Sequence, residues 1–538
     1  MVSLLKEKKH GGDEVETLDV KPVNAKENRA LYEARKKIHP KRADGFFRQF
    51  KWWIMLATLT VYYVTPWLRW DRGAGAPNQA VLLDLENRRF YFFFIEIWPH
   101  EFYYIAGLLV MAGIGLFLVT STLGRAWCGY TCPQTVWVDL FLVVERFFEG
   151  DRNARIKLDK APMSGSKFAK RLSKHFIWIM IAIATGGAWV FYFADAPTLF
   201  NALVFGQAAT GYYITIAALA ASTYIFGGFM REQVCTYMCP WPRIQIAMLD
   251  ENSLTVTYNS WRGENRARHA KQLRKKGETV GDCVDCNACV AVCPMGIDIR
   301  DGQQLECITC ALCIDACDSV MEKLGLEKGL IAYSTLNDYT ANMQLAGASG
   351  SISDIVSSKA YSQIKPERIR NPSGELVDKI KNTSWRSIMR PRTYIYLAIY
   401  SAIGLALAVV LANRNTLDVN IIHDRNPLFV TLSDGSIRNG YQIKILNMYG
   451  EPRKFRIEVE GLIGAKMKLS GAQGELSEFI LVDVEINKMR ALKLFVTLPV
   501  GKMTSNKMHF SFKVTVDGED VSSSTAANFE APEKYSKQ

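Results

Sequence analysis

The sequence predicts a multi-domain membrane protein, in which an α-helical transmembrane bundle is joined to a cysteine-rich domain and a C-terminal β-sandwich. Three observations predict this: five long apolar runs, two copies of one cysteine spacing, and short alternating runs near the C-terminus. The chain has 538 residues, too many for one hydrophobic core. Its composition, 49% hydrophobic and 22% charged, excludes a disordered or collagen-like chain.

Five apolar runs are candidates for spanning a bilayer, which takes about 20 predominantly apolar residues. They cover residues 52–68, 102–122, 176–194, 212–230 and 394–412. We expect spans rather than buried core helices, because most of the runs hold no charged residue. Two shorter apolar runs, 141–148 and 199–205, are more typical of interfacial or re-entrant segments.

Basic residues predict the orientation of these spans. Arginine and lysine gather in residues 35–51, 152–174 and 262–276, whereas residues 197–210, between the third and fourth runs, hold no charge. The N-terminus and the basic segments are therefore expected in the cytoplasm and the C-terminal residues outside. The net charge of +12 then indicates topology and contact with anionic lipid, and no nucleic acid is expected as a partner. No signal peptide is expected either, because the first 30 residues are polar.

Eight of the twelve cysteines repeat the spacing C-x2-C-x2-C-x3-C. This is the bacterial ferredoxin spacing for two 4Fe–4S clusters, in which the fourth cysteine of each run ligates the other cluster. The predicted ligands are Cys283, Cys286, Cys289 and Cys317 for cluster 1, and Cys293, Cys307, Cys310 and Cys313 for cluster 2. Zinc is the alternative metal, but the doubled spacing favours iron–sulfur clusters. A reducing cytoplasm disfavours disulfides. Two adjacent clusters form an electron relay.

The other four cysteines form two C-x3-C-P motifs, each just after a predicted span. Cys128 and Cys132 follow the second run, and Cys235 and Cys239 follow the fourth. Proline is typical of a first helical turn, so the second cysteine of each motif is expected at a helix start. Soft thiolates bind Cu(I), zinc or iron–sulfur iron, and Met238 adds a thioether, so we predict a metal or redox site with copper as the leading metal. A redox disulfide in each motif, or four buried small hydrophobic side chains, are the alternatives.

The last segment of the chain has a different character. It contains no cysteine and shows short runs with two-residue alternation, such as residues 441–446 and 509–516. Turn residues such as Asp517 and Gly518 separate these runs, which predicts an immunoglobulin-like β-sandwich. We expect this domain outside the membrane, in contact with a partner; passive capping is the alternative.

The predicted domains follow one another along the chain. They are a basic cytoplasmic segment (1–51), a four-span domain (52–230), a cytoplasmic region (231–391) with its ferredoxin core at 281–320, a fifth span (392–412) and the sandwich (413–538).

The chain resembles the cytochrome c oxidase accessory proteins of the FixG/RdxA/CcoG type over roughly residues 35–538. The marks are residues 66–73 (PWLRWDRG), 89–93 (RFYFF) and 95–99 (IEIWP), together with the C-x3-C-P motifs, the ferredoxin spacing and the terminal domain. The resemblance implies a bacterial inner-membrane protein with a periplasmic C-terminal domain. It also implies reduction of Cu(II) to Cu(I) for the copper centre of a cbb3-type oxidase, at the four cysteines of the C-x3-C-P motifs. Oxidase assembly factors and a copper chaperone or transporter are then the expected partners, and a homodimer is compatible with it.

Three functions are compatible with these features. The first is a membrane cupric reductase, in which a cytoplasmic donor reduces the clusters and the clusters reduce copper. The second is a quinol or quinone relay, with Glu96, Trp98 and Glu101 either lining a quinone pocket or anchoring the membrane interface. The third is a non-catalytic assembly scaffold with structural clusters.

Overall fold

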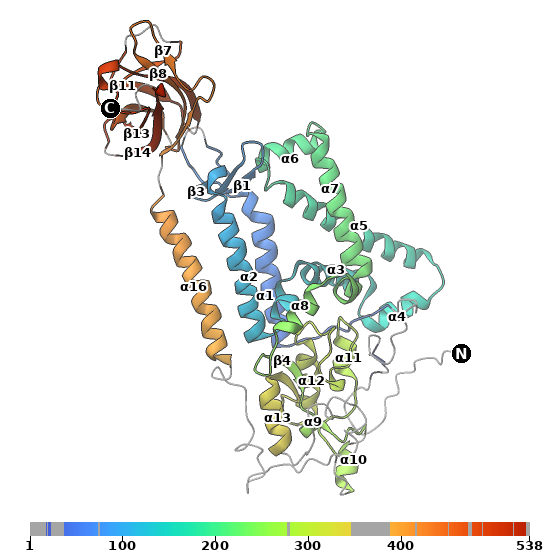
Figure 1. Cartoon of the computed structure of the whole chain (residues 1–538). Coiled ribbons are helices and arrows are strands. Elements are labelled where there is room, and N and C mark those ends of the chain that lie inside the picture. Colours follow the sequence, from blue (N-terminus) through green and yellow to red (C-terminus); the bar gives the residue numbers. More distant parts are fainter. Residues whose placement is uncertain are drawn as a thin grey trace. The chain divides into compact units, whose positions relative to one another are not determined.

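The chain divides into two compact units. The computed structural model describes residues 18, 20–22, 37–73, 76–268, 270–276, 280–345, 388–414, 417–449, 451–471, 476–486, 488–519 and 521–533. Unit 1 takes in residues 1–68 and 81–407, and unit 2 takes in residues 69–80 and 408–538 (Figure 1). The predicted transmembrane helices and the predicted ferredoxin core therefore lie largely in one compact unit.

A helix covers each of the five predicted spans. These helices are α1 (Phe46–Val64), α2 (Tyr103–Leu123), α5 (Gly165–Val190), α7 (Thr210–Thr223) with its π-helical continuation η5 (Tyr224–Met230), and α16 (Pro391–Ala412). By length and composition, three helical stretches of the described residues are able to cross a membrane: Pro99–Leu123, Thr210–Met230 and Pro391–Ala412. Little of their surface is buried inside the protein, as expected for helices that face lipid.

The other two helices, α1 and α5, begin with basic turns before their apolar runs. In α1 the buried Arg48 and Lys51 pair with Asp139. In α5 the buried Lys174 pairs with Glu149 at 2.7 Å. The carboxylates pair with these basic side chains, so each helix can include charged turns as well as its apolar run. The charged turns lower the mean hydropathy of α1 and α5, which are therefore not among the three apolar stretches named above. Three of the five predicted spans thus have the length and apolar composition of a membrane span, whereas α1 and α5 combine an apolar run with basic turns.

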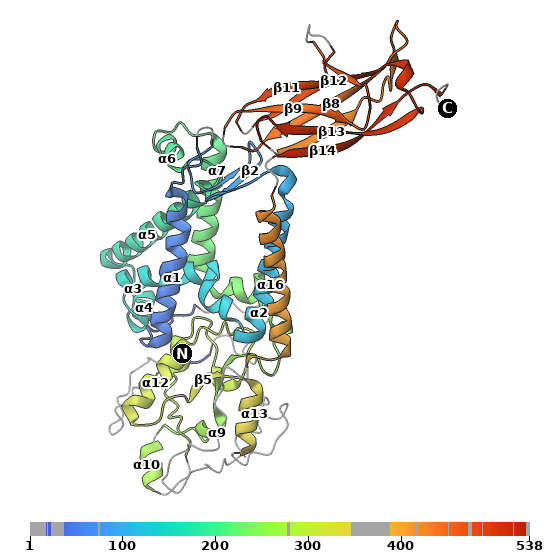
Figure 2. The same ribbon diagram turned by 90° about the vertical axis from the view of Figure 1, so that its left-hand side faces the viewer.

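Small residues bring neighbouring helices of unit 1 close together. A Cβ atom added to Gly186 of α5 would lie 2.8 Å from the carbonyl oxygen of Ile216 in α7. On α2, a Cβ added to Gly107 would meet Leu407 of α16 at 2.7 Å. Such contacts are typical of membrane helices, because a small residue lets two backbones approach. α1, α2, α7 and α16 run alongside one another (Figures 1 and 2).

Shorter elements connect these helices. They are η2 (Thr65–Trp67), the antiparallel strands β1 (Val81–Asp84), β2 (Arg89–Phe92) and β3 (Ile95–Ile97), η3 (Pro99–Glu101), α3 (Pro133–Glu149), α4 (Arg152–Lys160) and α6 (Ala196–Val204). The two short apolar runs predicted as interfacial segments form parts of α3 and α6. The sequence did not predict the β1–β3 sheet, because its strands are too short to show a clear alternation.

The cysteine-rich part of unit 1 is a small α+β fold. Its elements are α8 (Trp241–Met248), β4 (Thr255–Tyr258), α9 (Ser260–Gly263), α10 (Ala270–Lys275), α11 (Ala288–Val292), η7 (Ile299–Asp301), α12 (Leu312–Leu324), β5 (Ile331–Ser334) and α13 (Leu336–Leu345). β4 and β5 pair antiparallel. Their inner face packs against the helices α11 and α12, which follow the two cysteine loops.

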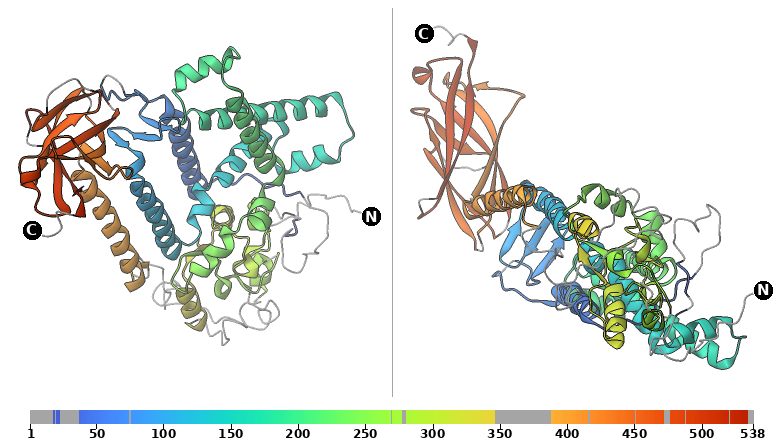
Figure 3. Two further views of the ribbon diagram at one scale, coloured as in Figure 1. Left: turned by 45° about the horizontal axis from the view of Figure 1, so that its top comes forward. Right: turned by 90° about the horizontal axis from the view of Figure 1, so that it is seen from below.

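Unit 2 is the predicted β-sandwich. Its strands are β6 (Leu417–His423), β7 (Val430–Thr431), β8 (Ile437–Asn447), β9 (Arg453–Glu460), β10 (Lys466–Leu469), β11 (Phe479–Val484), β12 (Met489–Leu498), β13 (Lys507–Val516) and β14 (Ser522–Glu530). One sheet has the order β10-β12-β8-β6, with β7 paired to β8, and the other has the order β11-β9-β13-β14. The orange and red strands of this unit are seen from two directions in Figure 3. Alternate residues point into one buried apolar core, which confirms the two-residue pattern of the sequence.

Candidate metal and redox site

Two matching loops present the first three cysteines of each ferredoxin-type run. Asp285 and Asn287 in the first loop have positive φ angles of 50° and 58°, and Thr309 and Ala311 in the second have 50° and 61°. These left-handed residues occupy equivalent places in the two repeats and curl each loop around its cysteines. The loops then enter α11 and α12, whose first turns carry the third cysteine of each run.

The fourth cysteine of each run lies beside the first cysteines of the other run. Burial raises the pKa of the Cys317 thiol, and the neighbouring Cys283 and Cys286 raise it further. Burial likewise raises the pKa of Cys293 to about 12, and Cys310 is its strongest cysteine neighbour. The structure therefore places Cys317 in one apolar cluster with Cys283 and Cys289, and Cys293 in another with Cys307 and Cys310.

The surroundings of these cysteines fit two iron–sulfur clusters. All eight are free thiols and none is fully exposed. Burial raises the pKa of Cys286 and of Cys307, whereas backbone N–H groups of Ala288 and Thr309 lower it by hydrogen bonding to the sulfurs. Such bonds stabilise ligand thiolates and influence the potential of a cluster. A cluster held here supplies one-electron transfer.

The two C-x3-C-P motifs fold in the same way. Cys128 lies in the π-helical turn η4 (Trp127–Thr131), and Cys132 caps the N-terminus of α3, with Pro133 in its first turn. Cys235 lies in the π-helical turn η6 (Val234–Met238), and Cys239 follows this turn just before Pro240 and α8. The weak sequence repeat is therefore a structural repeat, in which each motif follows an apolar helix.

Cys128 and Cys235 pack in one apolar cluster, and Cys132 and Cys239 lie near enough to influence both thiols. Burial raises the pKa of Cys235 to about 12, and the neighbouring Cys132, Cys128 and Cys239 raise it further. Burial raises the pKa of Cys128 to about 11, although the adjacent Arg125 lowers it. All four are free thiols. In the described part of the chain, no three His, Cys, Asp or Glu side chains are gathered closely enough to hold one metal ion.

Buried polar groups that the sequence did not indicate support the first motif. The Cys128 thiol donates a hydrogen bond to Oε1 of Gln245, at 2.9 Å. Gln245 is fully buried on α8, and its amide contacts Thr120 Oγ1 at 3.4 Å. The Thr135 hydroxyl donates to the Cys128 carbonyl oxygen at 2.6 Å. No local pattern marks Gln245, because only the packing of α8 against α2 brings it to Cys128.

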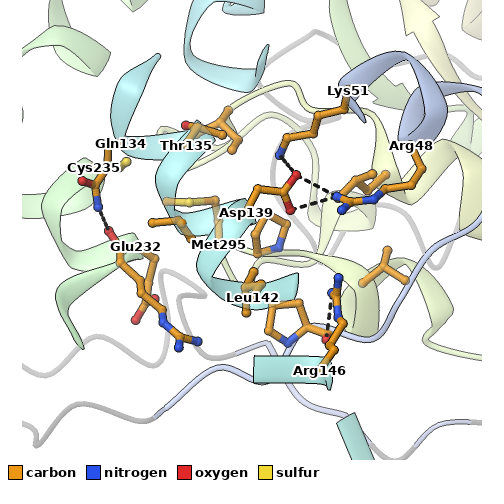
Figure 4. Close-up of a pocket in the computed structure, with 17 residues that line it drawn as sticks. Arg48, Lys51, Gln134, Thr135, Asp139, Leu142, Arg146, Glu232, Cys235 and Met295 are labelled. Carbon is orange, nitrogen blue, oxygen red and sulfur yellow. Dashed lines mark hydrogen bonds and ion pairs between the residues drawn. The ribbon is translucent and has the colours of Figure 1, made fainter. Parts of the chain in front are cut away.

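A cavity of about 40 Å³ lies beside Cys235 and is large enough for ordered water. Figure 4 shows Cys235 and Met295 on one side of it, and Asp139 with Arg48 on the other. Met295 is almost fully buried, whereas the predicted thioether ligand Met238 is 52% exposed. Met295 is thus the thioether that faces the same space as Cys235.

The ligand loop of predicted cluster 2 packs directly against the first C-x3-C-P motif. A Cβ atom added to Gly129 would lie 2.7 Å from the carbonyl oxygen of Ile308 and 3.2 Å from Cα of Cys310. The Tyr130 hydroxyl donates to the Cys310 carbonyl oxygen at 3.3 Å and contacts the Tyr333 hydroxyl. Arg125 donates to the carbonyl oxygen of Leu305, in the same loop region. These contacts join the membrane-side cysteines to the ferredoxin-type core.

A buried ion-pair network supports the second motif. Glu145 of α3 is fully buried and accepts from Arg155 at 2.9 Å and from Arg231 at 3.0 Å. Lys174 lies 3.8 Å from the same carboxylate. Although burial raises the pKa of Glu145, Arg231 and Arg155 lower it to about 2. The network ties α3, α4 and α5 to Arg231, which lies four residues before Cys235.

The residues considered for a quinone pocket pair with one another. Glu96 accepts from Arg89 at 3.3 Å, and the Arg89 guanidinium lies 3.7 Å from the ring centroid of Trp98. The buried Glu101 accepts from the backbone N–H of Trp98 at 3.1 Å. These contacts stabilise the turn between β3 and α2, which is consistent with a role as interface anchors.

Comparisons with known protein families agree with this architecture. A family described as a 4Fe-4S dicluster domain matches residues 230–336. A family described as a 4Fe-4S binding domain matches residues 105–149. The family of the IG-like fold at the C-terminal of FixG matches residues 407–532.

Three relatives match most of the chain. Nitrogen fixation protein FixG of Rhizobium meliloti (strain 1021) is 59% identical over 516 residues, which cover 96% of this chain and 97% of that protein. In Cereibacter sphaeroides, protein RdxA is 49% identical over 88% of this chain and 91% of its own length, and protein RdxB is 53% identical over 82% and 86%. These identities confirm the resemblance on which the sequence analysis relied. The chain therefore belongs to the family of FixG, RdxA and RdxB, as an iron–sulfur membrane protein of the type implicated in electron transfer.

Proposed function

We propose that this chain is a membrane electron carrier that reduces Cu(II) to Cu(I) at Cys128, Cys132, Cys235 and Cys239. The observation that carries the proposal is the meeting of these four soft donors, from two distant motifs, beside the ligand loop of predicted cluster 2. Thiolates prefer Cu(I), so the ligands themselves favour reduction. In each turnover a reduced cluster loses one electron and one Cu(II) becomes Cu(I).

The cellular setting belongs to the same proposal. The chain lies in a bacterial inner membrane, with its N-terminus and ferredoxin-type core in the cytoplasm and unit 2 in the periplasm. The concentration of basic residues in residues 35–51 and 152–174 supports this orientation. Cu(I) then passes, through a copper chaperone or transporter, to the assembly factors of a cbb3-type oxidase, which the family resemblance favours.

Substitution of the four cysteines tests the site. The variant Cys128→Ser/Cys132→Ser/Cys235→Ser/Cys239→Ser is purified anaerobically, its clusters are reduced, and Cu(I) formation is followed with a Cu(I)-specific chelator. We expect loss of turnover with cluster absorbance intact. Met238→Leu is the control, because this half-exposed side chain is expected to contribute little. Unchanged turnover in the quadruple variant would refute the copper site.

A third iron–sulfur cluster is the second candidate for these four cysteines. The family described as a 4Fe-4S binding domain matches residues 105–149, which contain only two cysteines, Cys128 and Cys132. Cys235 and Cys239 supply the two ligands that a 4Fe–4S cluster would still need. A 4Fe–4S cluster holds each of its four thiolates on a different iron.

Iron and copper analysis separates the two candidates. Two clusters account for about eight iron atoms per chain and three clusters for about twelve. Anaerobic purification with iron, sulfide and copper counts, and EPR spectra before and after copper addition, gives the occupant of the site. About twelve iron atoms, falling to about eight in the quadruple serine variant, would establish a three-cluster relay instead of a copper site.

A further inference from the structure

We propose that electrons enter the relay at predicted cluster 1 and leave it through predicted cluster 2, and that the basic surface beside cluster 1 docks an acidic one-electron carrier protein. This inference rests on the relay of the proposed function, but it does not depend on what occupies the four membrane-side cysteines.

Cluster 2 is the one that meets the membrane-side cysteines. Cys310 shares one buried apolar cluster with Cys128, and Cys235, Cys293 and Cys307 pack against the same cluster. Gly129 touches the Ile308–Cys310 backbone so closely that no side chain fits between them. Because electron transfer slows steeply with distance, cluster 2 is the donor to the four-cysteine site.

Cluster 1 has different neighbours. Cys283, Cys289 and Cys317 pack with residues of β4 and β5, including Val256 and Ile331. The segment 264–268 crosses the first cysteine loop, where the Ala267 N–H donates to the carbonyl oxygen of Cys283 at 3.2 Å. Arg268 on this segment pairs with Asp285 of the same loop at 3.3 Å. The segment therefore forms the protein surface over cluster 1, and α10 follows it directly.

The sequence of this segment and of α10 is strongly basic. Residues 264–276 contain one acidic residue, Glu264, against six basic residues: Arg266, Arg268, Lys271, Arg274, Lys275 and Lys276. The side chain of Arg268 is 62% exposed, and Lys276 is exposed as well. A concentrated patch of one sign steers a partner of opposite charge and raises its association rate.

The segment lies away from the apolar helices. Both Figures 1 and 2 place α10 at the end of unit 1 that lies away from α2, α7 and α16. The basic run 262–276 was expected at anionic lipid because it follows the fourth apolar run, but in the fold α10 lies at the opposite end of unit 1. Arg262 is not part of this surface, because its side chain is buried in an ion pair with Asp282 at 2.7 Å. The remaining charge fits a soluble acidic carrier such as a flavodoxin or a small ferredoxin.

Charge reversal tests the docking surface on the full chain in neutral nanodiscs. Arg268→Glu/Lys276→Glu is compared with Lys157→Glu/Lys160→Glu, which makes the same charge change at exposed positions of α4. Reduced acidic flavodoxin gives one electron per transfer, and stopped-flow absorbance follows cluster reduction. We expect the second-order rate constant to fall about tenfold or more in the first variant, with the wild-type salt dependence weakened. The α4 control is expected to stay near the wild-type rate.

Dithionite, a small reductant that needs no docking site, serves as the second arm. Equal dithionite rates in all variants show that the clusters are intact. The docking proposal is wrong if flavodoxin reduces Arg268→Glu/Lys276→Glu at the wild-type rate, or if the α4 variant loses as much. It is also wrong if the first variant changes only the yield of membrane insertion, because the patch would then contact lipid.

Removal of single clusters tests the direction. In Cys286→Ser, which lacks a predicted ligand of cluster 1, we expect flavodoxin to reduce cluster 2 at least tenfold more slowly, whereas dithionite still reduces it. In Cys313→Ser, cluster 1 is expected to accept electrons at the wild-type rate. Fast reduction of cluster 2 by flavodoxin in Cys286→Ser would overturn the direction. Copper is absent from these measurements. Failure of the cupric reductase proposal would appear in the separate copper assay, in which added Cu(II) would not reoxidise the clusters.

Discussion

Gly129 lies where the first C-x3-C-P motif packs against the loop of predicted cluster 2. It lies inside the first C-x3-C-P motif, and the atoms that a side chain would meet there are backbone atoms of the cluster 2 loop, which cannot move aside cheaply. Neighbouring Tyr130 fixes the same contact through its hydroxyl. The middle residues of the motif therefore position the cysteines relative to the ferredoxin-type core.

We expect Gly129→Ala to destabilise the protein and to slow electron transfer out of cluster 2. The added Cβ overpacks a backbone contact, which costs about 1–3 kcal/mol. Thermal unfolding and the rate of cluster reoxidation measure the two effects. Gly113→Ala is the matched control, because a Cβ at this position of α2 meets nothing within 4 Å. Equal behaviour of the two variants would contradict the proposed contact.

Tyr130→Phe is expected to make the potential of cluster 2 more negative and to leave that of cluster 1 unchanged. The substitution keeps the ring but removes the hydrogen bond to the Cys310 carbonyl, and loss of a donor near a cluster disfavours its reduced state. EPR-monitored redox titration resolves the two clusters. Tyr394→Phe, at an exposed position of α16, is the control. An equal shift of both clusters would show a general structural effect instead.

At the scale of elements, buried ion pairs join α3 to the helices around it. Glu145 on α3 gathers Arg155 of α4, Lys174 of α5 and Arg231 just before η6. Asp139, six residues earlier on α3, forms ion pairs with Arg48 and Lys51 of α1. Burial raises the pKa of Asp139, but the two cations outweigh it and hold the pKa below its usual value. The carboxylates of α3 thus form ion pairs with basic residues of the helices packed around it.

Replacement of Glu145 by glutamine is expected to lower stability by about 3 kcal/mol, because it leaves Arg155 and Arg231 buried without their counter-ion. Thermal unfolding of the detergent-solubilised protein measures this change. Glu322→Gln is the control, since Glu322 pairs with Lys328 at an exposed site where an ion pair contributes little. Similar losses in the two variants would contradict the importance of the network.

The same network predicts a pH dependence. The pKa of Glu145 is about 2 in the folded chain and 4.5 in its ordinary state, so its contribution is complete above pH 4.5 and is lost as the pH falls towards 2. Unfolding temperatures of the wild type are therefore expected to drop over this range. Glu145→Gln should show a shallower drop, and an unchanged slope would assign the acid sensitivity to other carboxylates.

At the scale of the whole molecule, the cysteines and the β-sandwich core lie in different units. The apolar core of unit 2 is built from its own strands, and residues 413–538 contain no cysteine. All twelve cysteines belong to unit 1. We expect a chain that ends after Asn413 to keep its full iron content and cluster absorbance. Metal analysis of the truncated protein checks this, and loss of iron would show that unit 2 is needed to assemble the clusters.

Local patterns made most of the fold predictable. The doubled spacing of eight cysteines predicted a ferredoxin-type core, and alternation in residues 441–446 and 509–516 predicted strands of a sandwich. The basic turns of α1 and α5 were harder to place, because their partners Asp139 and Glu149 are distant in the sequence. The basic run 262–276 was assigned to lipid for a similar reason, since sequence proximity to an apolar run does not determine proximity in space.

By itself, the sequence determined which residues are available for chemistry: their types and spacings show that eight cysteines suit two clusters and that four more form a repeated motif. Spacing acts over a single turn or loop, so it carries this information locally. Only the tertiary structure decided that Cys128 meets Cys235, that Gln245 contacts the first of these, and that the loop of Cys310 lies against Gly129. Such meetings depend on how separate helices pack, because burial and backbone contact join residues that no local period relates.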